Sequence, residues 1–513
     1  FNLTQFTEDK FRLSKKEINI IEKEFCILKN HFINSLFFSL KIAQRSFNEK
    51  NFSISRLSYF NKKMALYKNY LNKVFPPAAK IWVLDGLVIE KQIGGLKYLI
   101  GVKENQGAII DVLNSASSLA LGGENPWLLK MDRFEDFFGW KDNVCCAYHP
   151  GIRQAFILNE IKKFYPVKKN KNRVVVHMES SGSIVDSIAI ESVCRYAEKK
   201  LSIIDGKILA VDGTWAGGYG VAREATGFGV DKVLLEKQKK TLWVNRCLPP
   251  PTKNFANKFI KILKEKIEKE KVAGVYLEPD IIGDLGIIKT DEDLLLEVKK
   301  IMQQYQLPII LDCVQQLGRT GSYWGENVDR IFNDYDLLVI TTAKSASNGQ
   351  AFGMVILPHE IASCAYPLSQ ITTNQMNGPL LRVLLVAEVL NNKKLQQWFF
   401  EKSKIIEKIA KEEGLFNNLL GKYLNRGIYL GNNEQVKLAQ IALLIEDGIL
   451  VGALPAALRY QPMLLEFSET NKLIAQIIFR KVKNILRGKI SKKVVDIYNK
   501  MKNVNSGLAR KNK

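Results

Sequence analysis

Apolar segments of strand length alternate with amphipathic helical segments along the middle of the chain, between about residues 150 and 360. This alternation predicts an α/β fold, in which a parallel sheet carries helices on both faces. The expected strands are Val174 to Val176, Ile208 to Val211, Val272 to Leu277, Pro308 to Leu311 and Leu337 to Thr341.

The pattern changes on both sides of this region, which predicts more than one domain. The 513 residues are 46% hydrophobic and 25% charged, enough for one large core and a smaller domain. The expected divisions are a helical extension over 1–75, a segment of the small domain over 76–130, a large domain over 131–385, a smaller α+β domain over 386–503 and a disordered tail over 504–513.

The net charge of +23 raises the question of a nucleic-acid partner. The excess lies mostly in the first eighty residues and in Lys472 to Lys513, and lysine greatly outnumbers arginine. Because no helix-turn-helix, zinc-finger or RNA-binding signature accompanies it, we expect no nucleic-acid partner and interpret the charge mainly as solvated surface. Contact of the basic ends with a polyanion or an anionic membrane surface is the alternative. No apolar run is long enough to predict a transmembrane helix.

The cysteines and histidines indicate neither disulfides nor a metal site. Only Cys145 and Cys146 of the seven cysteines are adjacent, and adjacent cysteines do not easily form a disulfide. The four histidines are far apart, so no metal-ligand spacing is present. The residues from Phe1 onward also lack the order of a secretory signal, and we therefore expect a cytoplasmic protein.

Charged residues follow two of the expected strands, where ligands of open α/β sheets bind. Asp312 ends one strand and Lys344 follows the next, one crossover later, so both can face one ligand. Burying an acid at a strand end is costly unless it meets a cation, and a protonated pyridine nitrogen would supply one. A lone lysine in such a place is ordinarily exposed to solvent, which is the alternative.

Two further strand ends carry small or aromatic residues. Ser181, Gly182 and Ser183 begin a helix, whose free N–H groups and dipole can bind a phosphate, although a simple N-cap turn is the alternative. Trp215 lies beside a glycine loop and either stacks on a planar ligand or fills the core. The glycines of this loop lack the pattern of a dinucleotide site.

Together these residues resemble the class III pyridoxal-phosphate aminotransferases over roughly residues 80 to 470. The strongest match is Ile310 to Gly321, which is similar to the family's Asp-Glu-Val-Gln-x-Gly-x-Gly-Arg-Thr-Gly and is followed by an Ala-Lys pair. Weaker matches are Ala273 to Pro279, Gly107 to Pro126, Thr373 to Asn377 and Leu458 to Leu464. The resemblance implies fold type I, with a mostly parallel sheet of the seven-stranded kind in the large domain.

The resemblance also implies a role for individual residues. Lys344 would form the Schiff base (internal aldimine) with pyridoxal 5′-phosphate and shuttle a proton, and Asp312 would keep the pyridine nitrogen protonated. The other implied cofactor ligands are Gln315 at the 3-oxygen, Val314 and Trp215 on the ring faces, Ser181, Gly182 and Ser183 at the phosphate, and Thr373 reaching the phosphate of the partner subunit in a homodimer. The implied substrate residues are Arg459, which would bind a carboxylate, and Asp284, in place of a longer glutamate that gates the arginine.

The implied activity is transfer of an amino group from an amine or ω-amino acid, such as 4-aminobutyrate, lysine or ornithine, to a keto acid such as 2-oxoglutarate. Trp324 favours the 4-aminobutyrate and lysine ε-aminotransferase branch. Cys313, Ala216 and Ile184 depart from the family's pattern, which leaves substrate and turnover rate open. The alternatives are a racemase, aminomutase or decarboxylase on the same fold, and a non-catalytic binding protein derived from it.

Overall fold

The computed structural model describes residues 87–93, 96–101, 108–112, 121, 152–226, 243–283, 285–365, 380–462, 464, 468–499 and 502, with a few helical residues between 19 and 30. Most of the expected helical extension and the tail from 504 lie outside the described residues. So do Cys145, Cys146, Asp284 and Thr373.

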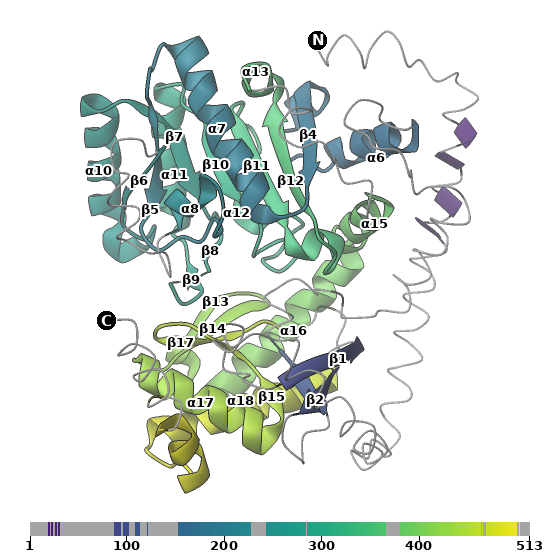
Figure 1. The fold of residues 1–513 in the computed structure, drawn as a ribbon, viewed down its shortest axis with the longest axis vertical. Helices are drawn as coiled ribbons and strands as arrows, with labels where there is room; N and C mark the ends of the chain where they lie inside the picture. Colours follow the sequence, from purple (N-terminus) through teal and green to yellow (C-terminus); the bar gives the residue numbers. More distant parts are fainter. Residues whose placement is uncertain are drawn as a thin grey trace, which may run out of the picture.

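A sheet of seven strands forms the centre of the molecule (Figure 1). In spatial order its strands are β4 (Val174–Glu179), β12 (Gly353–Pro358), β11 (Leu338–Ala343), β10 (Ile309–Asp312), β7 (Val272–Leu277), β5 (Lys207–Val211) and β6 (Val244–Leu248). Parallel pairing joins β11, β10, β7, β5 and β6, whereas β12 runs antiparallel to both β11 and β4. The mostly parallel sheet expected from the alternating pattern is therefore confirmed.

Helices cover both faces of this sheet, which explains why its central strands are apolar throughout. Every residue of β7, β10, β11 and β12 is buried. Helix α7 (Gly182–Leu201) packs on one face, where it lies across the strands in Figure 1, with the short helices α8 (Ala222–Ala225) and α13 (His359–Ala362) beside it. The apolar core of the other face includes side chains from α6 (Ile152–Lys162), α10 (Ala256–Lys269), α11 (Glu292–Gln304) and α12 (Glu326–Ile331).

Two smaller sheets lie with helices below the large sheet in Figure 1. One contains β13 (Leu419–Lys422), β14 (Asn425–Tyr429), β17 (Ala457–Tyr460) and β16 (Gly452–Ala453), and the other contains β1 (Leu87–Ile93), β2 (Leu96–Gly101), β3 (Ala108–Asp111) and β15 (Ile449–Leu450). Other elements of the described residues are the hairpin β8 (Ile281–Ile282) and β9 (Ile288–Lys289), and the helices α15 (Leu380–Leu390), α16 (Lys393–Glu412), α17 (Asn433–Asp447) and α18 (Ser468–Leu486).

Pairing of β3 with β15 brings together segments that are far apart in the sequence. The two strands run parallel, and Gln461 donates its backbone N–H to the carbonyl of Val112 at 2.9 Å. The domain divisions expected from the sequence stay a prediction, and the division after residue 385 falls inside α15.

Candidate active site

Lys344 and Asp312 lie at the ends of neighbouring strands. Asp312 is the last residue of β10 and is in register with Thr341 of β11, while Lys344 directly follows β11 and begins a short 3₁₀ helix, Lys344–Ser347. The backbone of Lys344 has a φ of 47°, in the left-handed region that residues other than glycine seldom adopt. Such strain persists only where the surrounding structure holds it, often at functional sites.

Asp312 is buried, and at least two donors among the described residues bind its carboxylate. The Tyr276 hydroxyl donates to Oδ2 at 2.7 Å, and the backbone N–H of Val314 donates to Oδ1 at 2.8 Å. An ionised carboxylate has about four lone-pair sites, so such a group can accept more than two donors. A protonated ring nitrogen is a donor of this kind and also supplies the cation that a buried carboxylate requires.

Gln315 lies close to Asp312 in the chain and is buried against a glycine. Its Oε1 makes no hydrogen bond, so the amide can present an oxygen or a nitrogen to a ligand. A Cβ at Gly283 would lie 2.4 Å from Gln315 Oε1, so a larger residue there would force the Gln315 amide to move. Arg459, on β17, donates from Nη2 to the Gly283 carbonyl at 3.2 Å. The Gly283 loop therefore brings the predicted residues Gln315 and Arg459 together.

The start of α7 lies against the same strand ends. A Cβ at Gly182 would lie 3.3 Å from the Cβ of Ala343 and 3.5 Å from Cγ2 of Val314. Ser181 occupies the N-cap position without a side-chain capping bond, so its hydroxyl does not occupy the first-turn N–H groups of this 20-residue helix. A helix start of this kind can bind an anion such as a phosphate.

The glycine loop after β5 closes over this helix start. Gly217 has a φ of 127°, and a Cβ there would lie 2.0 Å from Ser183 Oγ. Thr226 holds the loop, because its hydroxyl donates to the Gly217 carbonyl at 2.6 Å and accepts from the Gly217 N–H at 3.0 Å. Trp215 belongs to this loop and is partly exposed. The loop that follows β5 therefore lies directly against Ser183 at the start of α7.

Sequence reasoning assigned no role to three polar residues beside these strand ends. Glu278 follows β7 and accepts hydrogen bonds from the Thr214 hydroxyl at 2.8 Å and from the Gly283 N–H at 3.2 Å. Tyr276 donates its hydroxyl proton to Asp312, and Asp186 lies close enough to both residues for its pKa to be affected by them. The Glu-Pro pair that follows β7 could have indicated Glu278 as a site residue. Nothing in the sequence distinguishes Asp186 from an exposed residue of a helix.

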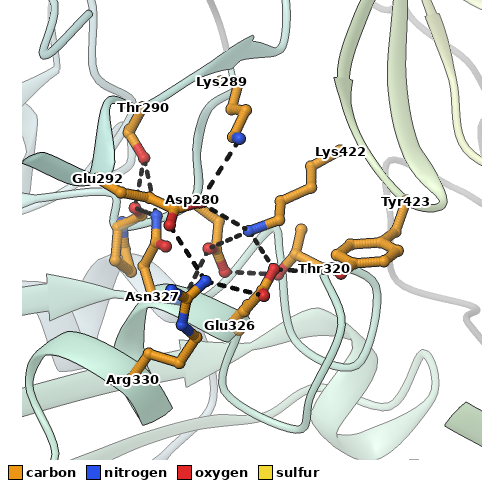
Figure 2. Close-up of polar contacts among 12 residues, drawn as sticks. Asp280, Lys289, Thr290, Glu292, Thr320, Glu326, Asn327, Arg330, Lys422 and Tyr423 are labelled. Carbon is orange, nitrogen blue, oxygen red and sulfur yellow. Dashed lines mark hydrogen bonds and ion pairs between the residues drawn. The ribbon is translucent and has the colours of Figure 1, made fainter.

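An ion-pair network next to the site joins the large sheet to β13 (Figure 2). Lys422 of β13 forms an ion pair with Glu326 and lies 3.8 Å from Asp280 and 3.7 Å from Glu292. Asp280 is wholly buried, and burial raises its pKa to about 6 even though Lys422 lowers it. It accepts hydrogen bonds from the Thr320 hydroxyl and the Asn327 N–H.

Comparison with known proteins identifies the family. Solved transaminases share the fold, including a cofactor-bound aminotransferase from Vibrio fluvialis with a TM-score of 0.65 at 17% identity, which covers 79% of this chain and 94% of that one. The fold is thus that of the fold-type-I pyridoxal-phosphate transaminases. Residues 102–480 match the family model described as aminotransferase class-III, and the chain belongs to that family.

Relatives with different activities resemble parts of the chain. A succinylornithine transaminase from Photorhabdus laumondii is 27% identical over 242 residues, which make up 45% of this chain and 58% of that protein. An alanine/serine racemase from Pyrococcus horikoshii is 25% identical over 249 residues, 46% of this chain and 51% of the racemase. The match therefore spans between half and three-fifths of the length of these two relatives.

The residues present fit pyridoxal 5′-phosphate, the cofactor of the family. Asp312 is a buried carboxylate whose charge suits a protonated ring nitrogen, the Gln315 amide is not fixed by a hydrogen bond to its oxygen and can turn its N–H group to a ligand, and the start of α7 has no side-chain cap. Among the described residues there is no cluster of three or more side chains that could hold a metal ion. No helix in the described part of the chain is long and apolar enough to cross a membrane.

Proposed function

We propose that this protein is a pyridoxal-phosphate-dependent transaminase that takes an amino group from an amine or ω-amino acid, such as 4-aminobutyrate, lysine or ornithine. The acceptor would be a keto acid such as 2-oxoglutarate. The observation that carries the proposal is the placement of Asp312 and Lys344 at neighbouring strand ends that face the start of α7. Membership of the class III family supports the reaction type.

The chain would hold the cofactor from three sides. Asp312 would bind the ring nitrogen and hold a proton on it, and Gln315 would donate to the ring's 3-oxygen. Val314 and Trp215 would pack on the two ring faces. Ser181, Gly182 and Ser183 would bind the phosphate through hydroxyl and backbone N–H groups at the start of α7.

When bound, pyridoxal phosphate supplies an electron sink for the negative charge that develops on the substrate carbon. Lys344 would attach the cofactor through Nζ. Once its amine is released, Nζ would accept the proton that leaves the substrate carbon next to nitrogen and would deliver it again later. Its fixed position after β11 keeps this proton transfer on one side of the substrate.

Arg459 would bind the carboxylate of an ω-amino acid or of the keto acid. Its planar guanidinium suits two parallel hydrogen bonds to a carboxylate, and its contact with Gly283 holds it beside Gln315. Asp284 follows Gly283 directly in the chain and would gate the arginine, so that substrates with and without a second carboxylate can both be accepted. We also propose that the enzyme belongs to the 4-aminobutyrate and lysine ε-aminotransferase branch, on the basis of Trp324.

We further propose a homodimer in a reducing, cytoplasmic setting. Thr373 would reach the phosphate bound in the partner subunit, so that each active site would need two chains. The cysteines of the described residues are all free, which is compatible with a reducing compartment.

Racemisation is the second candidate, favoured by the similarity to the alanine/serine racemase. A racemase returns the proton to the same carbon and needs no keto acid. The decisive experiment is an amino-donor screen of the purified protein with 2-oxoglutarate, in which glutamate formation is followed. Loss of donor chirality without glutamate formation would support the racemase, and neither reaction with any donor would contradict both.

A further inference from the structure

Asp186 is a buried acid that the proposed reaction does not use. It lies one turn into α7, on the side of the helix that packs against the sheet, and is 1% exposed. Its Oδ1 makes no hydrogen bond, nor does the hydroxyl of Thr341, which faces it from β11. A buried carboxylate with one oxygen that receives no hydrogen bond is costly in its ionised form, and this cost indicates a particular role or protonation state for Asp186.

Asp186 and Asp312 share one neighbour, the hydroxyl of Tyr276. This hydroxyl donates to Asp312 Oδ2 at 2.7 Å and also faces Asp186. Tyr276 is fully buried in β7, whose other residues are apolar or glycine. A phenol has one proton to donate, and that proton goes to Asp312. The oxygen of the same phenol can still accept a hydrogen bond from Asp186.

The surroundings decide which of the two carboxyl groups carries a proton. The Tyr276 hydroxyl and the Val314 N–H both donate to Asp312, and these hydrogen bonds stabilise its ionised form. Burial raises the pKa of Asp186 well above its usual value, and the negative charge of Asp312 raises it further. Glu278 acts in the same direction, whereas the hydroxyls of Thr341 and Tyr276 oppose it.

We propose that Asp186 is a positioning residue for the cofactor ring: a neutral carboxylic acid that donates to Tyr276 and thereby holds the Tyr276 hydroxyl on Asp312. The proposal rests on the proposed function, because it assigns the ring nitrogen to Asp312. The chain of donors runs from Asp186 through Tyr276 to Asp312 and disperses the charge of Asp312. Asp186 thus sets how strongly Asp312 attracts the proton on the ring nitrogen without touching the cofactor.

The protonation of Asp186 is tested in the protein without cofactor. Unfolded Asp186 ionises near pH 4, whereas the folded group keeps its proton, so the stability of the wild type falls relative to Asp186→Asn as the pH rises. We expect the ratio of their unfolding constants to change about tenfold for each pH unit between pH 5 and 7. Asp280→Asn, at another buried aspartate, is the matched control. The ratio of the unfolding constants of the wild type and Asp280→Asn should begin to level off above about pH 6. A ratio for Asp186→Asn that stays constant from pH 5 to 7 overturns the proposal.

The link to the ring is tested in the holoenzyme by the pH midpoint of the visible absorbance of the bound cofactor. Asp186→Leu and Tyr276→Phe both remove donors on the path to Asp312. Each should raise the midpoint by roughly half a unit to one unit, because Asp312 then holds positive charge more strongly. The double variant should shift no further than Tyr276→Phe alone, since both changes act through one path. Asp280→Asn should leave the midpoint where it is.

The proposal is overturned if Asp186→Leu leaves the pH midpoint of the absorbance unchanged. It is also overturned if the midpoint shifts of Asp186→Leu and Tyr276→Phe add up in the double variant, because the two residues would then act independently. The outcome is separable from that of the proposed function. If the wild type binds no pyridoxal phosphate, the proposed function fails, while the stability measurement still reports the proton on Asp186. If the wild type binds the cofactor and transfers amino groups but the variants keep its midpoint, only the present inference fails.

Discussion

Lys344 is the residue on which the proposed chemistry depends. Lys344→Ala should reduce glutamate formation by roughly a hundredfold or more, because one amine both attaches the cofactor and moves the substrate proton. Borohydride reduction followed by peptide mass mapping should place the cofactor on Lys344 in the wild type and on no residue in the variant. Lys300→Ala, an exposed lysine of α11, is the control and should keep both properties. Full activity in Lys344→Ala would reject the enzyme hypothesis in favour of the non-catalytic one.

Single residues explain why part of the site could be predicted and part could not. Asp312 and Lys344 follow apolar strands, and a strand end has a fixed place in a parallel sheet, so their proximity follows from local sequence. Asp186 occupies a helix, where its spacing is compatible with an exposed face as well as a buried one. Gly283 matters because of a close approach to Gln315, and no local pattern encodes a contact between separate loops.

At the scale of elements, the contact between the glycine loop and α7 determines the shape of the phosphate site. Gly217→Ala would place a Cβ 2.0 Å from Ser183 Oγ in a backbone conformation that alanine disfavours. The strain of about 1–3 kcal/mol should move the loop or Ser183, and the dissociation constant for pyridoxal phosphate should rise by roughly tenfold to a hundredfold. Fluorescence titration of the cofactor-free protein measures this constant.

The adjacent glycine supplies the control for this prediction. A Cβ at Gly218 would meet nothing within 4 Å, so Gly218→Ala should retain the wild-type dissociation constant. Equal weakening in both variants would indicate a general effect of loop stiffness, and unchanged binding in Gly217→Ala would show that the loop does not shape the phosphate site.

The buried network around Lys422 predicts a dependence of stability on pH (Figure 2). Burial raises the pKa of Asp280 from 3.8 to about 6 in the folded state. A group whose pKa is raised by folding contributes its full stabilisation when the pH is below the pKa of the unfolded chain. This stabilisation is lost as the pH rises through the pKa of the folded protein. The full loss of stability relative to Asp280→Asn should be about 3 kcal/mol; about 2 kcal/mol of it should fall between pH 4 and 6, and the difference should level off above about pH 7.

Denaturant unfolding of both proteins at pH 4, 5, 6 and 7 measures this difference. Asn retains the shape of Asp and cannot ionise, so lost hydrogen bonds from Thr320 and Asn327 shift all four values equally. A difference that does not change with pH would mean that Lys422 keeps Asp280 ionised throughout.

The strands of the large sheet differ in whether they could be predicted from the sequence. The strands β4, β5, β7, β10 and β11 contain apolar runs, and each was expected. The edge strand β6 was missed because its middle residues are polar and only partly buried. The strand β12 was missed because it follows Lys344 closely and returns antiparallel, without the helix that the alternation rule requires.

At the scale of the whole molecule, the proposed homodimer makes a prediction about mixed chains. If Thr373 reaches the phosphate in the partner subunit, one active site combines Lys344 of one chain with Thr373 of the other. Thr373→Ala homodimers should then need more cofactor for activity, and Lys344→Ala homodimers should be inactive at every cofactor concentration. Sedimentation should first establish that the protein is a dimer.

A heterodimer of one Lys344→Ala chain and one Thr373→Ala chain distinguishes the two arrangements. If Thr373 acts across the interface, one site of the heterodimer has lost both residues, but the other has an intact Lys344 and an intact Thr373. Separately tagged chains, co-purified and assayed at limiting cofactor, should then recover activity that neither parent homodimer has. If Thr373 acts within its own chain, every site that retains Lys344 lacks the threonine. The heterodimer would in that case be no more active at limiting cofactor than the Thr373→Ala homodimer, because the phosphate contact would be missing from each competent site.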